Sequence, residues 1–257
     1  MDLVRIEQDG AVATLTLSRP DRRNAVSTGM LRELTTAFGS MAQDREVRAV
    51  VLAGEGPDFC AGADVAELAA ARESLSGAEY GRMFEEVLGA IAELPMPVIA
   101  RVQGAAFGAG CQLVVACDLA VAALDARFAV PSARLGIVVN YENIERLVLA
   151  VGPKRAGEIL FTGRVVSGGE AGDWGLVNRA VLPQELDATT AEMAAAIADA
   201  APLSVRGSKR GIRAALFSMG LEESGFHTMV ADALGSEDLR EGLAAFLERR
   251  KPDFKGS

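Results

Sequence analysis

Two runs of small residues govern the architecture of this 257-residue chain: Phe59-Cys60-Ala61-Gly62-Ala63-Asp64-Val65 and Gly104-Ala105-Ala106-Phe107-Gly108-Ala109-Gly110-Cys111-Gln112. Each run is expected to open a helix directly after a strand or loop, and the first turn of a helix leaves backbone N–H groups without partners. Two such openings that face each other form a pocket of donors without a charged side chain. Such a pocket suits an oxygen that becomes negative during a reaction, such as a thioester carbonyl that turns into an enolate.

Strands and helices alternate around these two runs. Residues 11–17 alternate apolar and polar side chains, which is typical of a strand. Residues 28–41 repeat apolar side chains at helical spacing after a capping residue, Ser27 or Thr28. The alternation predicts an α/β fold with parallel strand pairing. The other predicted strands are 47–53, 98–102 and 119–122, and the other predicted helices are 84–94 and 112–117.

The pattern becomes wholly helical from about Leu182 onward. Because a helical region with a wide apolar stripe must bury that stripe, we expect part of it to pack on another subunit. The polar, alanine-rich segment 66–77 is either a lid or an ordinary helix. The four predicted C-terminal helices are 186–198, 204–216, 221–234 and 238–249.

Composition narrows the classes of function. Half of the residues are apolar, so the chain can bury a sizeable core. The formal net charge of −9 argues against non-specific binding to nucleic acid. The three cysteines are odd in number and lie in apolar segments, which favours reduced thiols and a cytoplasmic location. We expect no membrane span and no signal peptide, because no apolar run is long enough for the first and the initial residues lack the apolar segment of the second.

Six segments, in the right order, resemble the enoyl-CoA hydratase/isomerase family, also called the crotonase superfamily. Arg19-Pro20 with Asn24-Ala25-Val26 looks like the family's first CoA-contacting loop, and the two small-residue runs look like its two oxyanion segments. The match to the second oxyanion segment is longer than the run itself and extends from Pro97 to Asp118. The remaining matches are to the family's later helical signatures, at residues 161–163, 171–177 and 236–254.

This resemblance implies a crotonase-like spiral of ββα units followed by a C-terminal helical trimerisation region. We place the core at residues 1–200 and the helical oligomerisation region at 201–257. The resemblance also implies homotrimers, often paired as hexamers, and an acyl-CoA or enoyl-CoA ligand. It implies no metal and no separate cofactor, because CoA is itself part of the ligand.

The resemblance assigns roles to individual residues. The backbone N–H groups of Ala63 and Ala109 are the two implied oxyanion donors. Many relatives have Gly at the position of Ala109, and the N–H stays available here if the local φ is negative. For Asp64, capping of the following helix is an alternative to contact with the CoA arm. The implied ligand-binding set is Arg23, Ala25, Ala61, Ala63, Asp64, Val65, Ala109, Gln112 and Ser132.

The chain departs from the family where hydratases carry two glutamates. The resemblance maps these to Gln112 and Ser132. Glutamine cannot titrate, and serine has no useful pKa without a neighbouring base. Since a general acid or base contributes about 10²–10⁴-fold in rate, we expect weak or no hydratase activity. The combination also resembles a subset of actinobacterial-type members that bind acyl-CoA without turning it over.

Substitute chemistry is the alternative interpretation. Glu142, Tyr141 or Glu145 would then supply the missing acid or base, which would make the chain an active hydratase or isomerase of fatty acid metabolism. Cys111 has no His partner to activate it as a nucleophile and is better explained as a buried side chain of the core. The single histidine, His227, lies in the predicted C-terminal helices, away from the pocket.

Overall fold

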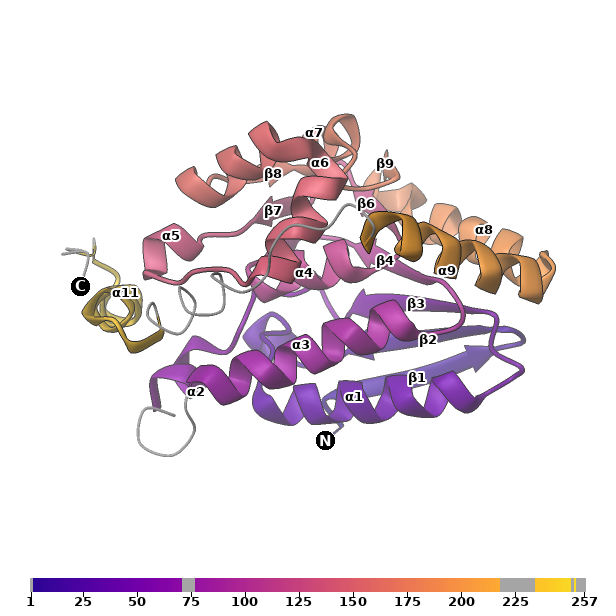
Figure 1. Ribbon diagram of the computed structural model, residues 1–257, viewed down its shortest axis with the longest axis horizontal. Helices are drawn as coiled ribbons and strands as arrows, with labels where there is room; N and C mark the ends of the chain where they lie inside the picture. Colours follow the sequence, from indigo (N-terminus) through magenta and orange to yellow (C-terminus); the bar gives the residue numbers. More distant parts are fainter. Residues whose placement is uncertain (1, 71–76, 218–233, 251, 253–257) are drawn as a thin grey trace.

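A six-stranded sheet forms the centre of the computed structural model, which describes residues 2–70, 77–217, 234–250 and 252 (Figure 1). Only its first strand is antiparallel to its neighbour, and all other neighbouring strands run parallel. The strand order is β1 (Val4–Asp9), β2 (Val12–Leu17), β3 (Ala49–Gly54), β4 (Val98–Val102), β6 (Leu119–Ala123) and β9 (Arg179–Val181).

The burial of these strands follows their sequence patterns. In β2, Ala13, Leu15 and Leu17 are buried and the threonines between them are partly exposed, as the alternation predicts. Every residue of β3 is buried, which fits a central parallel strand covered on both faces. The predicted α/β class with parallel pairing is therefore confirmed.

A second, three-stranded sheet lies beside the first and was not predicted. Its strands are β5 (Ala105–Phe107), β7 (Arg127–Ala129) and β8 (Val166–Ser167), in that order. An isolated bridge pairs Cys60 with Ala106, so the first small-residue run extends this sheet. The helices around it are α4 (Ala109–Ala116), α5 (Ser132–Leu135), α6 (Tyr141–Thr162) and α7 (Gly168–Trp174).

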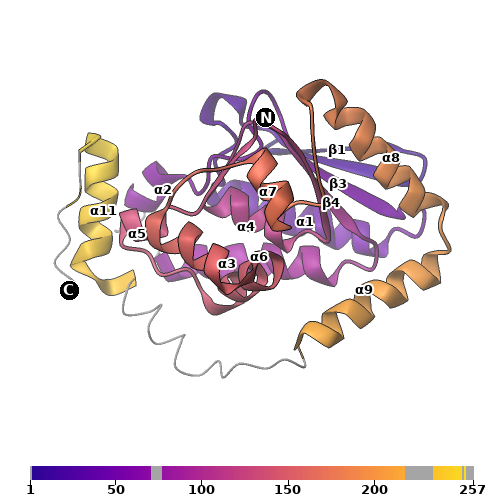
Figure 2. The same ribbon diagram turned by 90° about the horizontal axis from the view of Figure 1, so that it is seen from above.

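The remaining helices pack around the larger sheet. Helix α8 (Leu186–Asp199) packs on β3, β4 and β6, and α1 (Thr28–Gln43) packs on β1 and α3 (Gly77–Glu93) (Figures 1 and 2). Ser27 is the residue that caps α1, because its side chain accepts from the Met30 amide. Three short elements complete this part of the fold: η1 (Pro20–Arg22), α2 (Val65–Ala70) and η3 (Pro183–Glu185).

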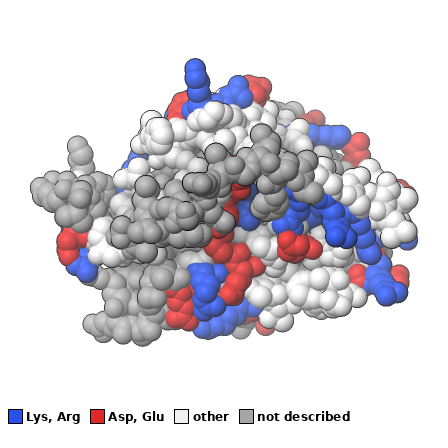
Figure 3. Space-filling view, in the orientation of Figure 1, with Lys and Arg blue, Asp and Glu red and all other residues white. Residues whose placement is uncertain are grey.

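The helical C-terminal region is present in the described residues as α9 (Pro202–Phe217) and α11 (Glu237–Glu248). Helix α11 packs on α5 and α2, far from α9 (Figure 2). Lys209 fixes α9 to the core, since its buried ammonium donates to the Ile91 and Met96 carbonyls and pairs with Asp118 at 2.7 Å. Lys and Arg side chains gather over α9 on the face shown in Figure 3. The predicted helix 221–234, apart from its last residue, lies outside the described residues, and so does His227.

Two predicted helices differ from the structure in their starting points. The helix expected at 112–117 begins earlier, at Ala109, and the helix expected at 84–94 begins at Gly77. The alternative of a helix in segment 66–77 is correct for the described part, which continues α2 to Ala70. Among the helices that the structure describes, none combines the length and the apolar character needed to cross a membrane.

Candidate functional site

The two small-residue runs lie against each other. The Cys60 amide donates to the Ala105 carbonyl at 2.8 Å, and the Phe107 amide donates back to the Cys60 carbonyl at 2.9 Å. Further along, a β-carbon on Gly110 would lie 2.3 Å from the Cys60 carbonyl oxygen, a distance that only glycine avoids. The start of α4 therefore approaches the first run as closely as backbone allows.

Two amides at this junction have no acceptor among the residues that the structure describes. Ala109 is the first residue of α4, and Ala63 follows Gly62, whose φ is +114°. A β-carbon on Gly62 would lie 3.9 Å from the Ala109 nitrogen, so the two segments are neighbours. Within the part of the chain that the structure describes, neither the Ala63 nor the Ala109 N–H donates a hydrogen bond. The φ of Ala109 is not positive, so its methyl group leaves the N–H available.

A loop that includes Val26 is hydrogen-bonded to the residues on both sides of Ala63. The Val26 amide donates to the Gly62 carbonyl at 2.8 Å, and the Asp64 amide donates to the Val26 carbonyl at 2.9 Å. These two bonds use the backbone N–H and the backbone carbonyl of Val26. The Ala63 N–H takes part in neither of them. The loop itself is fixed by Asn24, which is fully buried, has a φ of +55° and donates to the Glu55 and Asp58 carbonyls.

Charged residues next to this loop are paired. The Arg23 side chain hydrogen-bonds Asp58 at 2.7 Å, and this contact lowers the pKa of the Asp58 carboxyl group. Arg19 donates to Asp64 at 2.9 Å and also to the carbonyl of Ala25. The predicted ligand contacts Arg23 and Asp64 therefore have partners within the chain.

Asp64 also caps α2, because its carboxylate accepts from the Glu67 amide at 3.2 Å. Burial alone would raise the pKa of Asp64, but the bonds from Arg19 and from the Glu67 amide outweigh it and lower the pKa. Val65 begins α2, and the Ala61 amide donates to the Arg23 carbonyl. The side chain of Asp64 thus has the capping role that was the alternative to a ligand contact.

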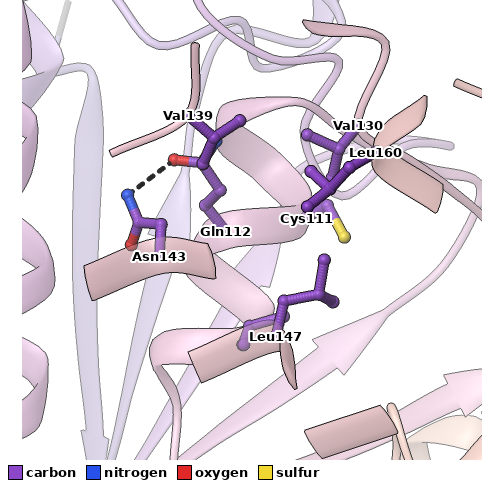
Figure 4. Close-up of a pocket in the computed structure, with 8 residues that line it drawn as sticks. Cys111, Gln112, Val130, Val139, Asn143, Leu147 and Leu160 are labelled. Carbon is purple, nitrogen blue, oxygen red and sulfur yellow. Dashed lines mark hydrogen bonds between the residues drawn. The ribbon is translucent and has the colours of Figure 1, made fainter. Parts of the chain in front are cut away.

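A small, mostly apolar cavity opens beside α4 (Figure 4). It lies between α4 and α6, and two polar side chains, Gln112 and Asn143, line it at one side. Burial raises the pKa of the Cys111 thiol in its wall to about 12, so this cysteine is not a nucleophile at neutral pH. The other lining residues are Val115, Val130, Val139, Leu147 and Leu160.

A hydrogen-bonded network joins the cavity to α3. The Asn143 amide nitrogen donates to the Gln112 oxygen at 2.9 Å, shown dashed in Figure 4, and to the Glu85 carboxylate at 2.8 Å. Arg146 donates to the Asn143 oxygen at 2.7 Å and lies 3.9 Å from Glu85. Burial raises the pKa of the Glu85 carboxyl group. Glu85 is thus a half-buried carboxylate two hydrogen bonds away from Gln112.

Sequence reasoning missed Glu85 and Asn143. Asn143 is buried and lies four residues before the buried Leu147, which in turn lies four residues before the buried Val151. Glu85 follows Phe84 at the edge of the buried stripe of α3. The sequence could have pointed to Asn143, because it is a polar residue at a position of the helix where apolar residues recur, and buried polar groups need partners.

The other predicted residues are near the cavity but do not line it. Ser132 begins α5, two residues after Val130. Tyr141 and Glu142 directly precede Asn143 in the first turn of α6, and the Tyr141 hydroxyl lies 3.4 Å from Glu145. Among the described residues, no group of three or more His, Cys, Asp or Glu side chains gathers as metal ligands do.

Known proteins resemble this chain over its full length. The family model described as enoyl-CoA hydratase/isomerase matches residues 7–257. A short-chain-enoyl-CoA hydratase of Clostridium acetobutylicum is 34% identical over 254 residues, which cover 96% of this chain and 95% of the relative. A crotonyl-CoA hydratase of Syntrophomonas wolfei is 35% identical over 254 residues, covering 97% of this chain and 96% of the relative.

Solved structures agree with these matches. An enoyl-CoA hydratase/carnithine racemase from Magnetospirillum magneticum is 35% identical, with a TM-score of 0.81 and coverage of 100% of this chain and 97% of that one. A methylmalonyl-CoA decarboxylase complexed with 2S-carboxypropyl CoA is 27% identical, with a TM-score of 0.90 and coverage of 100% and 99%. Sequence, fold and the paired small-residue runs lead to one conclusion: the chain belongs to the enoyl-CoA hydratase/isomerase family and has the crotonase fold.

Proposed function

We propose that this protein binds CoA thioesters by donating the Ala63 and Ala109 amides to the thioester carbonyl oxygen. The observation that carries the proposal is the pair of neighbouring backbone N–H groups without an acceptor in the described residues. Neighbouring backbone donors without acceptors can stabilise an oxygen that gains negative charge. Family membership supports an acyl-CoA or enoyl-CoA ligand, and the proposal needs no metal or separate cofactor.

We further propose that hydration of enoyl-CoA is weak or absent. Gln112 and Ser132 stand where the family resemblance places the two hydratase glutamates. Water addition needs one group to activate the water and one to protonate the α-carbon, and neither side chain titrates in the required range. The Gln112 side-chain oxygen accepts from the neutral amide of Asn143 rather than from a charged partner, and this contact suits a glutamine at position 112.

Two active alternatives remain within the same site. In the first, Glu142 or Tyr141 supplies the acid or base of a hydratase or isomerase, which their position beside Asn143 supports. The second is decarboxylation of a 2-carboxyacyl thioester, favoured by the likeness to methylmalonyl-CoA decarboxylase. There the bond between C2 and the carboxylate carbon breaks, CO₂ leaves, and the electron pair forms an enolate that solvent protonates at C2. Paired amides suffice for that step, because no side chain has to remove a proton from carbon.

Assembly into a homotrimer or a hexamer is part of the proposal. Leu203 and Ile212 on α9 are 83% and 63% exposed, and a second chain packed on this helix would cover apolar surface there. Light scattering of the purified protein should give a mass of three or six chains. A monomer would contradict this part alone.

Removal of one donor tests the central proposal. Ala109→Pro deletes the N–H at the first position of α4, where proline fits helical geometry. We expect the affinity for butyryl-CoA, measured by calorimetry, to fall about tenfold. Glu237→Pro makes the same change at the first position of α11, at an exposed residue, and should leave affinity unchanged.

The same preparations decide between binding and turnover. With crotonyl-CoA, the enoyl-thioester absorbance should persist in the presence of the wild type. Rapid loss of that absorbance would overturn the proposal of weak hydration. Turnover that disappears in Glu142→Gln would favour the first alternative. Undiminished thioester affinity in Ala109→Pro would contradict the role given to the two amides.

A further inference from the structure

The orientation of Gln112 is fixed by charges that lie outside the cavity. Arg146 carries only donors, so it requires the oxygen of Asn143 to face it, and the Glu85 carboxylate accepts from the Asn143 nitrogen. If the Asn143 amide were flipped, its nitrogen would face the Arg146 donor and its oxygen would face the Glu85 carboxylate. The two charged partners therefore fix the orientation of the amide. Its second N–H then meets Gln112, which must present its oxygen.

This arrangement leaves the Gln112 nitrogen as a donor. Within the described ranges 2–70, 77–217, 234–250 and 252, the Gln112 Nε2 atom donates to no acceptor. No fully buried side-chain nitrogen or oxygen of these residues lacks a partner, so Nε2 is accessible. Gln112 lines the cavity, whose other walls are mostly aliphatic (Figure 4). An amide donor at the edge of an apolar cavity distinguishes ligands with an oxygen from ligands without one.

The position of Gln112 relates this donor to the acyl chain. Gln112 lies three residues after Ala109 on α4, so the β-carbons of the two residues lie on one face of the helix, about 5–6 Å apart. If the oxygen on carbon 1 of the thioester accepts from the Ala109 amide, an acyl chain that runs along this face of α4 brings carbon 3 to the Gln112 side chain. We propose that Gln112 is a specificity-determining residue that donates to an oxygen on carbon 3 of the acyl group, with Asn143 as its positioning residue. This inference rests on the proposed function, because it uses the Ala109 amide as the anchor of the thioester.

Two classes of thioester carry such an oxygen. In a 3-oxoacyl thioester it is a ketone, and in a 2-carboxyacyl thioester it belongs to the carboxylate. Both present an acceptor on the third carbon, and the saturated analogue of each presents a methyl or methylene group instead. Leaving the Gln112 donor against an apolar group costs a hydrogen bond, which predicts about a tenfold loss of affinity.

Two matched pairs of ligands test the inference by calorimetry. Acetoacetyl-CoA is compared with butyryl-CoA, and methylmalonyl-CoA with isobutyryl-CoA. We expect the wild type to prefer the oxygen-bearing member by about tenfold in at least one pair. A preference in the first pair identifies a neutral carbonyl as the recognised group, and a preference in the second identifies a carboxylate.

Two variants separate recognition from stability. Gln112→Met keeps the length of the side chain but removes the donor, so the ratio of affinities within each ligand pair should fall to about one. Asn143→Leu should reduce the preference ratio although Gln112 is intact, which a merely structural role would not do. Gln43→Met, the same exchange at an exposed position, is the control and should retain the preference.

The outcomes are distinguishable from those of the proposed function. Equal affinities within both pairs, or a preference that survives in Gln112→Met, would overturn this inference and leave thioester binding intact. No saturable binding of any of the four thioesters to the wild type would overturn the proposed function, and this inference with it.

Discussion

Gly110 and Cys60 approach each other so closely that a β-carbon on Gly110 would come within 2.3 Å of the Cys60 carbonyl oxygen. This contact joins the start of α4 to the first small-residue run. Ala109 directly precedes Gly110 and Ala63 lies three residues after Cys60, so the separation of their amides depends on the absence of a side chain at position 110.

Gly110→Ala should therefore separate the two amides. The added methyl group cannot displace backbone cheaply, so α4 or the first run must shift. We expect acyl-CoA affinity to fall at least tenfold, about 1.4 kcal/mol, in a calorimetric titration. Gly81→Ala is the control, because a β-carbon there meets nothing within 4 Å. Full affinity in Gly110→Ala would show that the spacing of the amides does not matter.

Lys209→Met should detach α9 from the core. The ammonium group serves two carbonyls and Asp118, and methionine leaves all three without this partner. Removing one member of a buried pair costs about 3–5 kcal/mol in the free energy of unfolding, measured in urea. Lys154→Met changes an exposed lysine and should cost less than about 0.5 kcal/mol. Similar costs for the two variants would contradict the anchoring role.

Asp58→Asn should weaken the protein at neutral pH but not in acid. The Arg23 hydrogen bond lowers the pKa of Asp58 in the folded state. A lowered pKa stabilises the fold above the pKa of the unfolded chain, and this contribution disappears as the pH falls through the folded-state value. Urea unfolding from neutral pH to about pH 3 should show the wild type and variant converging. A difference that is constant across this range would exclude charge as its origin.

Glutamates at the two altered positions should restore hydration if the family correspondence holds. Gln112→Glu with Ser132→Glu supplies titratable groups at the two positions that the family resemblance assigns to the hydratase glutamates, and each is worth about 10²–10⁴-fold in rate. The double variant should hydrate crotonyl-CoA faster than either single variant, as followed by absorbance. An inactive but folded double variant that still binds butyryl-CoA would mean that the cavity places carbons 2 and 3 elsewhere.

The sequence was informative where a pattern is local. The strand pattern around Leu15 and the small residues around Ala63 and Ala109 predicted the larger sheet and the two runs, and the structure describes both. The second sheet was missed because strands of two or three residues, such as Val166–Ser167, show no periodicity. Helix α4 starts before its predicted residue because alanine and glycine carry little apolar signal.

The polar network was beyond sequence reasoning for a different reason. Glu85 and Asn143 are 58 residues apart, and only the packing of α3 and α6 beside α4 brings them together with Gln112. Arg146 shares the same first turns of α6, yet no spacing rule relates it to a carboxylate on another helix. Such contacts depend on tertiary structure, which a single sequence does not reveal.

Asn24 has a consequence for the kinetics of ligand capture. Its buried side chain and the bonds of Val26 hold the segment before Ala63 in place through groups of the chain itself. The conformational entropy of this segment is thus lost during folding rather than during association. Entry of a thioester should accordingly be limited by diffusion into the cavity, and differences in affinity among thioesters should arise from how long each one stays.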